Sequence, residues 1–265
     1  MDRSTARLRA PRSAPGVPLI TDPWFYLCAV PAVLLYGMSK GGLGSGSAIL
    51  AVPILTLAID PVRAAAIMLP ILCVMDLFAI WRFRQQFDPA QLRIMLPAGI
   101  AGVAIASLSL GRLSNDAMRI VVGTLTVVFC LHYWLAPVAT SARRPGRLAG
   151  YFWSCVSGMT STQFHAGGPP ANIYMLRLGL DVMRLMGTMA MFFGILNYVK
   201  LIPYALLGQF DRRNLLQSLV LMPLAPIGVG IGYWSLSRIE PQVFYRVLYL
   251  LLFLSGCKLL YDGWG

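Results

Sequence analysis

The chain has 265 residues, of which 57% are hydrophobic and only 12% are charged, and its formal net charge is +12. A water-soluble domain carries about a quarter charged residues, so this composition excludes a soluble globular protein and predicts a polytopic membrane protein. The positive charge does not indicate nucleic-acid binding, because the basic residues are mostly single arginines or pairs in short gaps between apolar runs. The partner expected from composition is therefore the lipid bilayer, with no nucleic acid.

The first segment, residues 1–22, is basic and rich in proline and alanine. It lacks a small-residue cleavage site after the first apolar run, so we predict a cytoplasmic tail and not a cleaved signal. The five cysteines all lie inside apolar runs, and no CxxC or HxxxH spacing occurs. We therefore expect buried thiols, no metal site and no cofactor.

Ten apolar runs follow the tail. Six are long enough to cross an apolar core of about 30 Å, which needs roughly 20 residues, and four are too short alone. The short runs form two pairs, each flanking a Gly-rich break. If each pair makes one discontinuous span, the chain is all-α, with about eight transmembrane helices in two four-helix repeats. The long runs are 62–83, 92–110, 117–136, 182–207, 215–236 and 243–261, and the short ones are 24–38, 48–59, 148–161 and 171–178.

The two halves of the chain match each other, which predicts a duplicated unit. We place the first transmembrane repeat at 23–137, a basic cytoplasmic linker at 138–147 and the second repeat at 148–265. Duplication around a central break is common in transporters. At a shift of 121, Gly37, Met38, Gly46, Asp60, Arg63 and Asp76 fall on Gly158, Met159, Gly167, Asp181, Arg184 and Asn197, and the shift grows to 123 at Asp88 and 127 at Arg119.

Basic residues also suggest an orientation. With eight crossings, 13 lysines and arginines lie on one side and 7 on the other. The positive-inside rule then places both termini in the cytoplasm of a bacterial cell, with the chain in the inner membrane. The alternative treats each broken pair as a re-entrant hairpin and inverts the two halves, and charge counting favours the first arrangement only modestly.

The two breaks, "SKGGLGSGS" and "TSTQFHAGG", are the candidate site. Irregular backbone at membrane depth must be buried in protein or line a wet cavity, so we expect both breaks to line one cavity. Ser47 is a good N-cap for a following short helix, and Pro169 and Pro170 suit the first turn of another. Helix N-termini beside a lysine form an anion site. The predicted substrate-binding residues are Lys40, Gly41, Gly42, Gly44, Ser45, Gly46, Ser47, Gln163, His165, Gly167, Gly168 and Asn172. The alternative role for the glycines is close helix packing.

Other polar residues lie inside the apolar runs. Asp76 is costly there without a partner, so it could pair with Lys40 in the empty state, carry a proton or cap a neighbouring helix. Asn197, at the matching place in the second half, is expected to make an interhelical hydrogen bond. With His165, these two are the candidates for coupling or gating. Lys200 and His132 are expected to snorkel to the interface.

The stretches "GMSKGGLGSGSAILAVPILTLAIDPVRAAA" and "SGMTSTQFHAGGPPANIYMLRLGLDVMRLMGT" resemble the sulfite exporter TauE/SafE family of bacterial permeases. The resemblance covers nearly the whole chain from Val33. The second stretch departs from the family pattern at "QFHAGGPP", and Tyr174 stands where the first has Pro53. The resemblance implies a transporter of small sulfur-containing anions such as sulfite, organosulfonates or sulfoacetate, not an enzyme, with no catalytic residues.

Export fits the membrane potential, because moving one negative charge outward is favoured by about 2.3 kcal/mol per 100 mV. A proton-coupled importer using Asp76 or His165 is the alternative, and a passive channel differs from both only in its kinetics. An intramembrane serine hydrolase would use Ser45 or Ser47 with His165 or His132. Those serines and histidines show no third orienting group, which argues against it. The sequence leaves a homodimer open.

Overall fold

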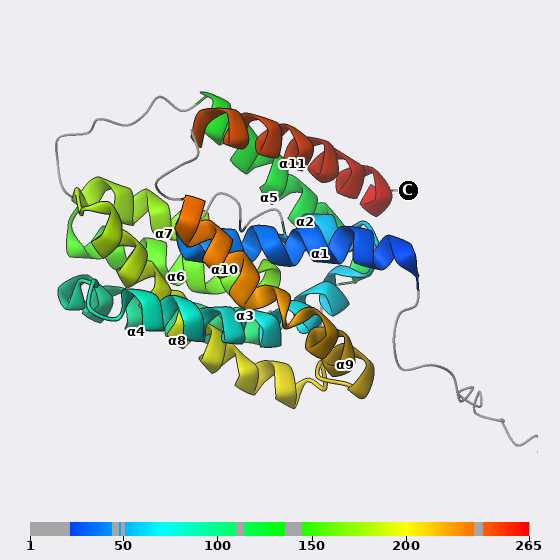
Figure 1. Cartoon of the computed structure of the whole chain (residues 1–265), viewed down its shortest axis with the longest axis horizontal. Helices are drawn as coiled ribbons and strands as arrows, with labels where there is room; N and C mark the ends of the chain where they lie inside the picture. Colours follow the sequence, from blue (N-terminus) through cyan, green and yellow to red (C-terminus); the bar gives the residue numbers. More distant parts are fainter. Residues whose placement is uncertain are drawn as a thin grey trace, which may run out of the picture.

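The computed structural model describes residues 22–43, 48, 51–109, 114–135, 145–235 and 241–264, and within them every regular element is a helix (Figure 1). The predicted all-α class is therefore confirmed for the described part of the chain. The helices are α1 (Pro23–Met38), η1 (Ser39–Leu43), α2 (Ala51–Thr56), α3 (Pro61–Phe83), α4 (Pro89–Ser109), α5 (Asn115–Leu135), α6 (Arg147–Phe164), α7 (Gly168–Met175), η3 (Leu176–Leu178), α8 (Val182–Leu206), α9 (Arg212–Leu221), α10 (Leu224–Ser235) and α11 (Pro241–Trp264).

Aspartates define several helix starts. Asp181 accepts a hydrogen bond from the Arg184 backbone N–H at 3.0 Å, and Asp211 accepts one from the Asn214 N–H at 2.7 Å. Asp88 accepts from the two N–H groups that open α4, at 2.9 and 3.1 Å. These are N-caps, which satisfy donors that a helix start leaves unpaired. The aspartates matched between the halves, such as Asp88 and Asp211, thus begin corresponding helices.

Three described helices are long and apolar enough to cross a membrane: Pro61–Phe83, Pro89–Leu108 and Val182–Leu206. The pair α9 and α10, bent by 42° at its break, passes the same test as a fourth. Large apolar side chains on their outer faces are exposed, including Trp81, Leu108 and Leu206. A face of this kind suits lipid and not water, because exposed apolar area is costly only against water.

Each Gly-rich break reverses the chain, so the expected discontinuous span is wrong in this respect and the re-entrant alternative describes the structure. After α1, the chain returns until the Trp24 indole N–H donates to the Leu57 carbonyl at 3.4 Å. After α6, it returns until Tyr174 packs on Gly150, where an added Cβ would lie 2.7 Å from the Tyr174 ring. The short helices α2 and α7 cover only about 9 and 12 Å, too little to complete a crossing.

The backbone geometry of two described residues contributes to the reversals. His165 ends α6 in the left-handed region with φ 51°, and Gly42 adopts φ 142° inside η1. A left-handed residue at the end of a helix turns the chain sharply, and a φ of 142° is open to glycine but not to ordinary L-residues. Because α1 begins at the end of the bundle where α2 returns, we call each of these units a hairpin: hairpin 1 is residues 23–56 and hairpin 2 is residues 147–175.

The two halves run in opposite directions. We name the ends of the bundle the Asp22 end, where α1 begins, and the Asp88 end, where α4 begins. Hairpin 1 begins and ends at the Asp22 end, and α3, α4 and α5 then run in alternating directions. Hairpin 2 begins and ends at the Asp88 end, and α11 finishes at the Asp22 end (Figure 1). An ion pair of 3.6 Å between Asp60 and Arg119 joins α3 and α5 at the Asp22 end.

This inversion removes the charge argument for orientation. Each connecting segment is counted with the end at which its flanking helices lie, and Lys40 and Lys200 are left inside. The lysines and arginines then number ten at each end, in place of 13 against 7. The positive-inside rule therefore favours neither end over the complete chain.

The helix pairing repeats across the halves. α1 packs on α10 and α6 packs on α4, while α3 pairs with α8 and α5 with α11. Glycines permit the closest crossings. A Cβ on Gly158 would lie 2.1 Å from the Gly99 carbonyl oxygen, and one on Gly41 would lie 2.1 Å from that of Val229. Close packing, the alternative role for the glycines, thus applies to Gly41.

Candidate functional site

One cavity of about 50 Å³ lies where the two hairpins meet α8. A water needs about 10–15 Å³ of such space, so the cavity holds about four waters or one anion of similar size. It is lined by Tyr36, Ser39, Lys40 and Ala48 of the first half and by Gly168, Asn172, Met186, Met189, Ala190 and Phe193 of the second. The structure thus brings Lys40, Gly168 and Asn172, three of the predicted site residues, to one small space.

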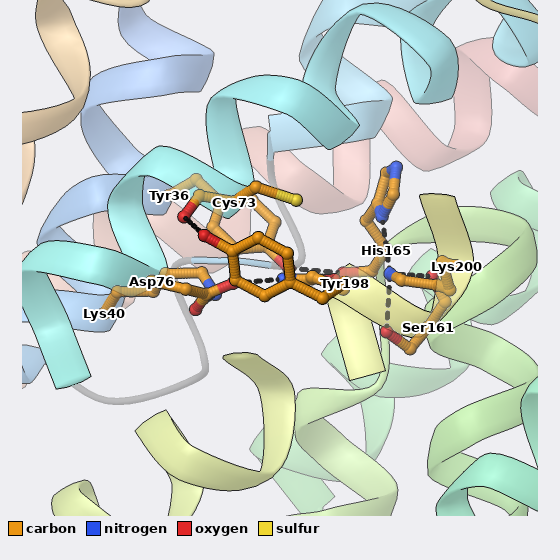
Figure 2. A network of polar contacts seen from close by, with 9 residues as sticks. Tyr36, Lys40, Cys73, Asp76, Ser161, His165, Tyr198 and Lys200 are labelled. Carbon is orange, nitrogen blue, oxygen red and sulfur yellow. Dashed lines mark hydrogen bonds and ion pairs between the residues drawn. The ribbon is translucent and has the colours of Figure 1, made fainter. Parts of the chain in front are cut away.

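Lys40 is the charged group of this cavity. Its ammonium forms an ion pair with Asp76, and the two side chains are 10% and 0% exposed (Figure 2). The Asn197 amide donates to the other carboxylate oxygen of Asp76 at 2.6 Å. The pairing with Lys40, one of the three roles expected for Asp76, and the expected interhelical hydrogen bond of Asn197 are both present. Because Asp76 and Asn197 are matched positions, the contact joins the two halves at their symmetry axis.

Lys200 forms a second cluster, and its expected snorkelling is wrong. Its side chain is fully buried. Its Nζ donates to the Ser161 carbonyl at 3.0 Å, to the Ser161 hydroxyl at 3.0 Å and to Nδ1 of His165 at 3.1 Å. These three acceptors satisfy the amine inside the protein, so the side chain has no need to reach the interface.

His165 holds Lys200 and does not line the cavity. Its Nε2 lies 2.9 Å from the Ala65 carbonyl oxygen, which can only accept, so Nε2 carries the hydrogen. Nδ1 is then the acceptor for Lys200, and the imidazole is neutral. The residue is 1% exposed. Both ring nitrogens are therefore occupied by protein partners, and the side chain is buried away from the predicted substrate.

Tyr36 connects the cavity to the Lys200 cluster. Its ring lies 5.6 Å from the Lys40 Nζ, in the range of a cation–π contact. Its hydroxyl donates to the His165 carbonyl at 3.0 Å. Figure 2 shows the two clusters side by side, with Lys40 and Asp76 at one end and Lys200 at the other. The two charged groups thus belong to one polar network inside an apolar bundle.

A model of the family described as "Sulfite exporter TauE/SafE" matches residues 29–259. The chain belongs to this family. The TauE/SafE family is one of membrane transporters and not of enzymes. Searches of curated proteins and of solved structures found no match.

The remaining predicted site residues of this TauE/SafE protein fall in several places. Gly44, Ser45, Gly46 and Ser47 lie outside the described residues, as does the side chain of His132. Gln163 is in the last turn of α6, and the Gly167 carbonyl accepts from the Ser157 hydroxyl at 2.7 Å. Among the described residues, no group of three or more His, Cys, Asp or Glu side chains is placed to hold a metal ion.

The start of α7 differs from the predicted anion site. Pro169 and Pro170 occupy the first turn, as expected. However, prolines have no N–H, and the Ala171 N–H already donates to the Gly167 carbonyl at 3.3 Å. Few backbone donors therefore remain at this helix start. The second half contributes to the cavity through Gly168 and the Asn172 side chain.

Sequence reasoning missed Tyr36 and Ser39 as cavity residues. Tyr36 precedes Lys40 by four residues, one helical turn, so the spacing alone could have placed both on one face. It also missed the burial of Lys200, which follows Asn197 by three residues on α8. Asn197 was already expected to face another helix, and Lys200 shares its face.

Proposed function

We propose that this protein exports small sulfur-containing anions, such as sulfite, an organosulfonate or sulfoacetate, and that the anion binds beside Lys40 in the shared cavity. The observation that carries the proposal is a lysine at a cavity of anion size, lined by both halves, in a chain of the sulfite exporter family. The cavity walls are otherwise largely apolar, so Lys40 and the Asn172 amide supply the recognition.

The proposed membrane topology has two inverted repeats. Each repeat contributes a deep re-entrant hairpin and three spans, so hairpin helices α1 and α6 with six spans make up the eight membrane helices. The spans are α3, α4, α5, α8, the α9–α10 pair and α11. We place the protein in the bacterial inner membrane. Inverted repeats support alternating access, because exchanging the conformations of the two halves moves the opening from one side to the other.

The cavity lies nearer the Asp88 end. Its α8 residues, from Met186 to Phe193, belong to the half of α8 that starts at that end. Toward the Asp22 end, Lys200, Tyr204 and Phe210 fill the space, and the rings of Tyr204 and Phe210 stack at 6.0 Å. The proposed transport cycle therefore opens a path on the Asp22 side by moving hairpin 2 away from these residues.

Outward transport of an anion without a coupling ion is driven by the membrane potential, at about 2.3 kcal/mol per charge per 100 mV. In the alternative, an importer, Asp76 would carry a proton after losing Lys40 to the anion. His165 is the weaker candidate for that role, because both of its ring nitrogens are engaged.

Flux of radiolabelled sulfite from proteoliposomes tests the proposal. Lys40→Met and the double variant Lys40→Met/Asp76→Asn should abolish saturable flux, and the double variant keeps the interior free of an unpaired carboxylate. Lys258→Met is the matched control, because Lys258 is exposed and pairs with Asp262 one turn away. Wild-type flux in the correctly folded double variant would refute the site.

A further inference from the structure

We infer that Lys200, although it does not line the cavity, sets the net charge of the site so that it accepts singly charged anions in preference to doubly charged ones. The inference rests on the proposed function, because it specifies the valence of the anion bound beside Lys40. It assigns a selectivity role to a residue of α8 that the sequence separates from Lys40 by 160 positions.

The interior network holds three charged groups in the described part of the chain: Lys40, Asp76 and Lys200. The other titratable side chains that face them are phenols and a thiol, which are neutral near pH 7, together with the neutral imidazole of His165. These neutral groups are Tyr36, Cys73, Tyr198 and Tyr204. The buried polar groups of α9 are uncharged: Ser218, which donates to the Ile67 carbonyl at 2.7 Å, Asn214 and Gln217.

The surroundings of Lys200 match an ammonium group. Three acceptors lie 3.0–3.1 Å from Nζ, one for each of its hydrogens. The Nδ1 acceptor is available because the Ala65 carbonyl fixes the hydrogen of His165 on Nε2. Two lysines and one aspartate therefore give the empty site a net charge of +1.

The second hairpin receives its positive charge from Lys200. Ser161 occupies the position that Lys40 occupies in the first repeat, 121 residues earlier. Lys200 donates twice to this serine, so an ammonium lies at both matched positions. Asn197, which holds Asp76, precedes Lys200 by one helical turn. Lys200 thus places a second positive charge on the same face of α8 as the residue that holds Asp76, and this charge partly compensates Asp76 when Lys40 binds a substrate.

Charge balance then selects the anion. When an anion binds the Lys40 ammonium, Asp76 loses its ion pair. It keeps the hydrogen bond from Asn197 and the electrostatic attraction of Lys200. With a single negative charge on the anion, the four charges sum to zero. A doubly charged anion leaves one uncompensated negative charge inside a low-dielectric bundle, which is costly. The loaded protein is neutral with a monoanion, and the empty protein carries +1.

Two tetrahedral probes of different charge test this: methanesulfonate, with one negative charge, and sulfate, with two at pH 7.5. Binding is measured by calorimetry on the purified full-length protein. We expect wild-type protein to bind methanesulfonate at least about tenfold more tightly than sulfate. Asp76→Asn raises the interior charge to +2 and should shift this ratio toward sulfate by about tenfold. Lys200→Met lowers the charge to zero; it should weaken methanesulfonate binding by about tenfold and sulfate binding by more, so that the selectivity ratio rises.

The double variant Lys200→Met/Asp76→Asn is decisive, because it restores a charge of +1. It should recover the wild-type affinity for methanesulfonate and the wild-type selectivity ratio, which a purely structural role of Lys200 does not predict. Lys258→Met is the control, since it removes one positive charge at an exposed position outside the network, where Lys258 pairs with Asp262; its selectivity ratio should equal that of wild type.

A selectivity ratio that stays the same in Lys200→Met, or a double variant without recovery, would overturn the inference while leaving sulfite transport intact. If Lys200→Met does not fold, an unchanged ratio in Asp76→Asn overturns it instead. Wild-type protein that transports no sulfite and binds neither probe would overturn the proposed function and this inference together.

Discussion

Replacing Lys40 with methionine should destabilise the protein more than replacing Asp76 with asparagine, although both changes break the same ion pair. Asp76 is fully buried, and without Lys40 its carboxylate keeps only the 2.6 Å hydrogen bond from Asn197. Removing one partner of a buried pair costs about 3–5 kcal/mol, because the other charge stays uncompensated. For a chain of this size, that corresponds to a fall in Tm of roughly 6–10 °C.

The reverse change should cost less. Lys40 borders the cavity, its side chain is 10% exposed, and it keeps the Tyr36 ring at 5.6 Å. Water in the cavity can solvate the ammonium, so Asp76→Asn should cost about 1–2 kcal/mol. The double variant Lys40→Met/Asp76→Asn has no unpaired charge and should be more stable than Lys40→Met alone by about 2 kcal/mol.

Thermal unfolding of the four proteins in one detergent, followed by tryptophan fluorescence, completes the double-mutant cycle. The non-additivity measures the coupling between the two side chains. Equal losses in the two single variants, or a double variant whose loss is the sum of theirs, would refute the asymmetry between a buried carboxylate and a cavity-facing ammonium.

Two further predictions concern the helix crossings and the hairpins. Gly158→Ala places a Cβ 2.1 Å from the Gly99 carbonyl oxygen, so α4 and α6 must separate and the free energy of unfolding should fall by about 1–3 kcal/mol. Gly230→Ala meets nothing within 4 Å and should leave the Tm unchanged. Equal Tm values for the two variants would contradict the close crossing. In a background without the five native cysteines, Asp22→Cys and Asp60→Cys should react with an impermeant maleimide from the same side of the membrane. Labelling from opposite sides would show that residues 23–56 cross the membrane and do not form hairpin 1.

The parts of the fold that depend on local sequence were predictable. Apolar run length and composition indicated membrane helices. The shift of 121 showed that Asp76 and Asn197 occupy matching positions in the two halves. A carboxylate in an apolar run needs a partner, and the lysine at the nearest break is the obvious cation. Pairing with Lys40 was one of three roles expected for Asp76, and the structure contains it.

The direction of the hairpins could not be predicted in the same way. A short apolar run, a glycine break and another short run have the same lengths whether the chain continues or returns. The difference arises from tertiary packing, such as Tyr174 against Gly150 and Trp24 against Leu57. The predicted distribution of basic residues between the two sides was wrong for the same reason, because the side of each residue depends on the number of crossings.

Lys200 was misjudged for a related reason. Its position near the end of the run 182–207 suggested a route to the interface. Its three acceptors come from Ser161 and His165, which the sequence separates from it by 39 and 35 residues. Only the fold of hairpin 2 against α8 shows that the amine is satisfied inside.

The equal number of basic residues at the two ends has a consequence for biogenesis. A protein built from two opposed halves is nearly unchanged when it is turned over, so the insertion machinery has little to distinguish its two orientations. The four arginines of residues 1–22 account for four of the ten at the Asp22 end, and the chain without them would carry six against ten. The tail arginines therefore cancel an excess of basic residues at the Asp88 end, and a chain without them is expected to insert with the Asp88 end in the cytoplasm.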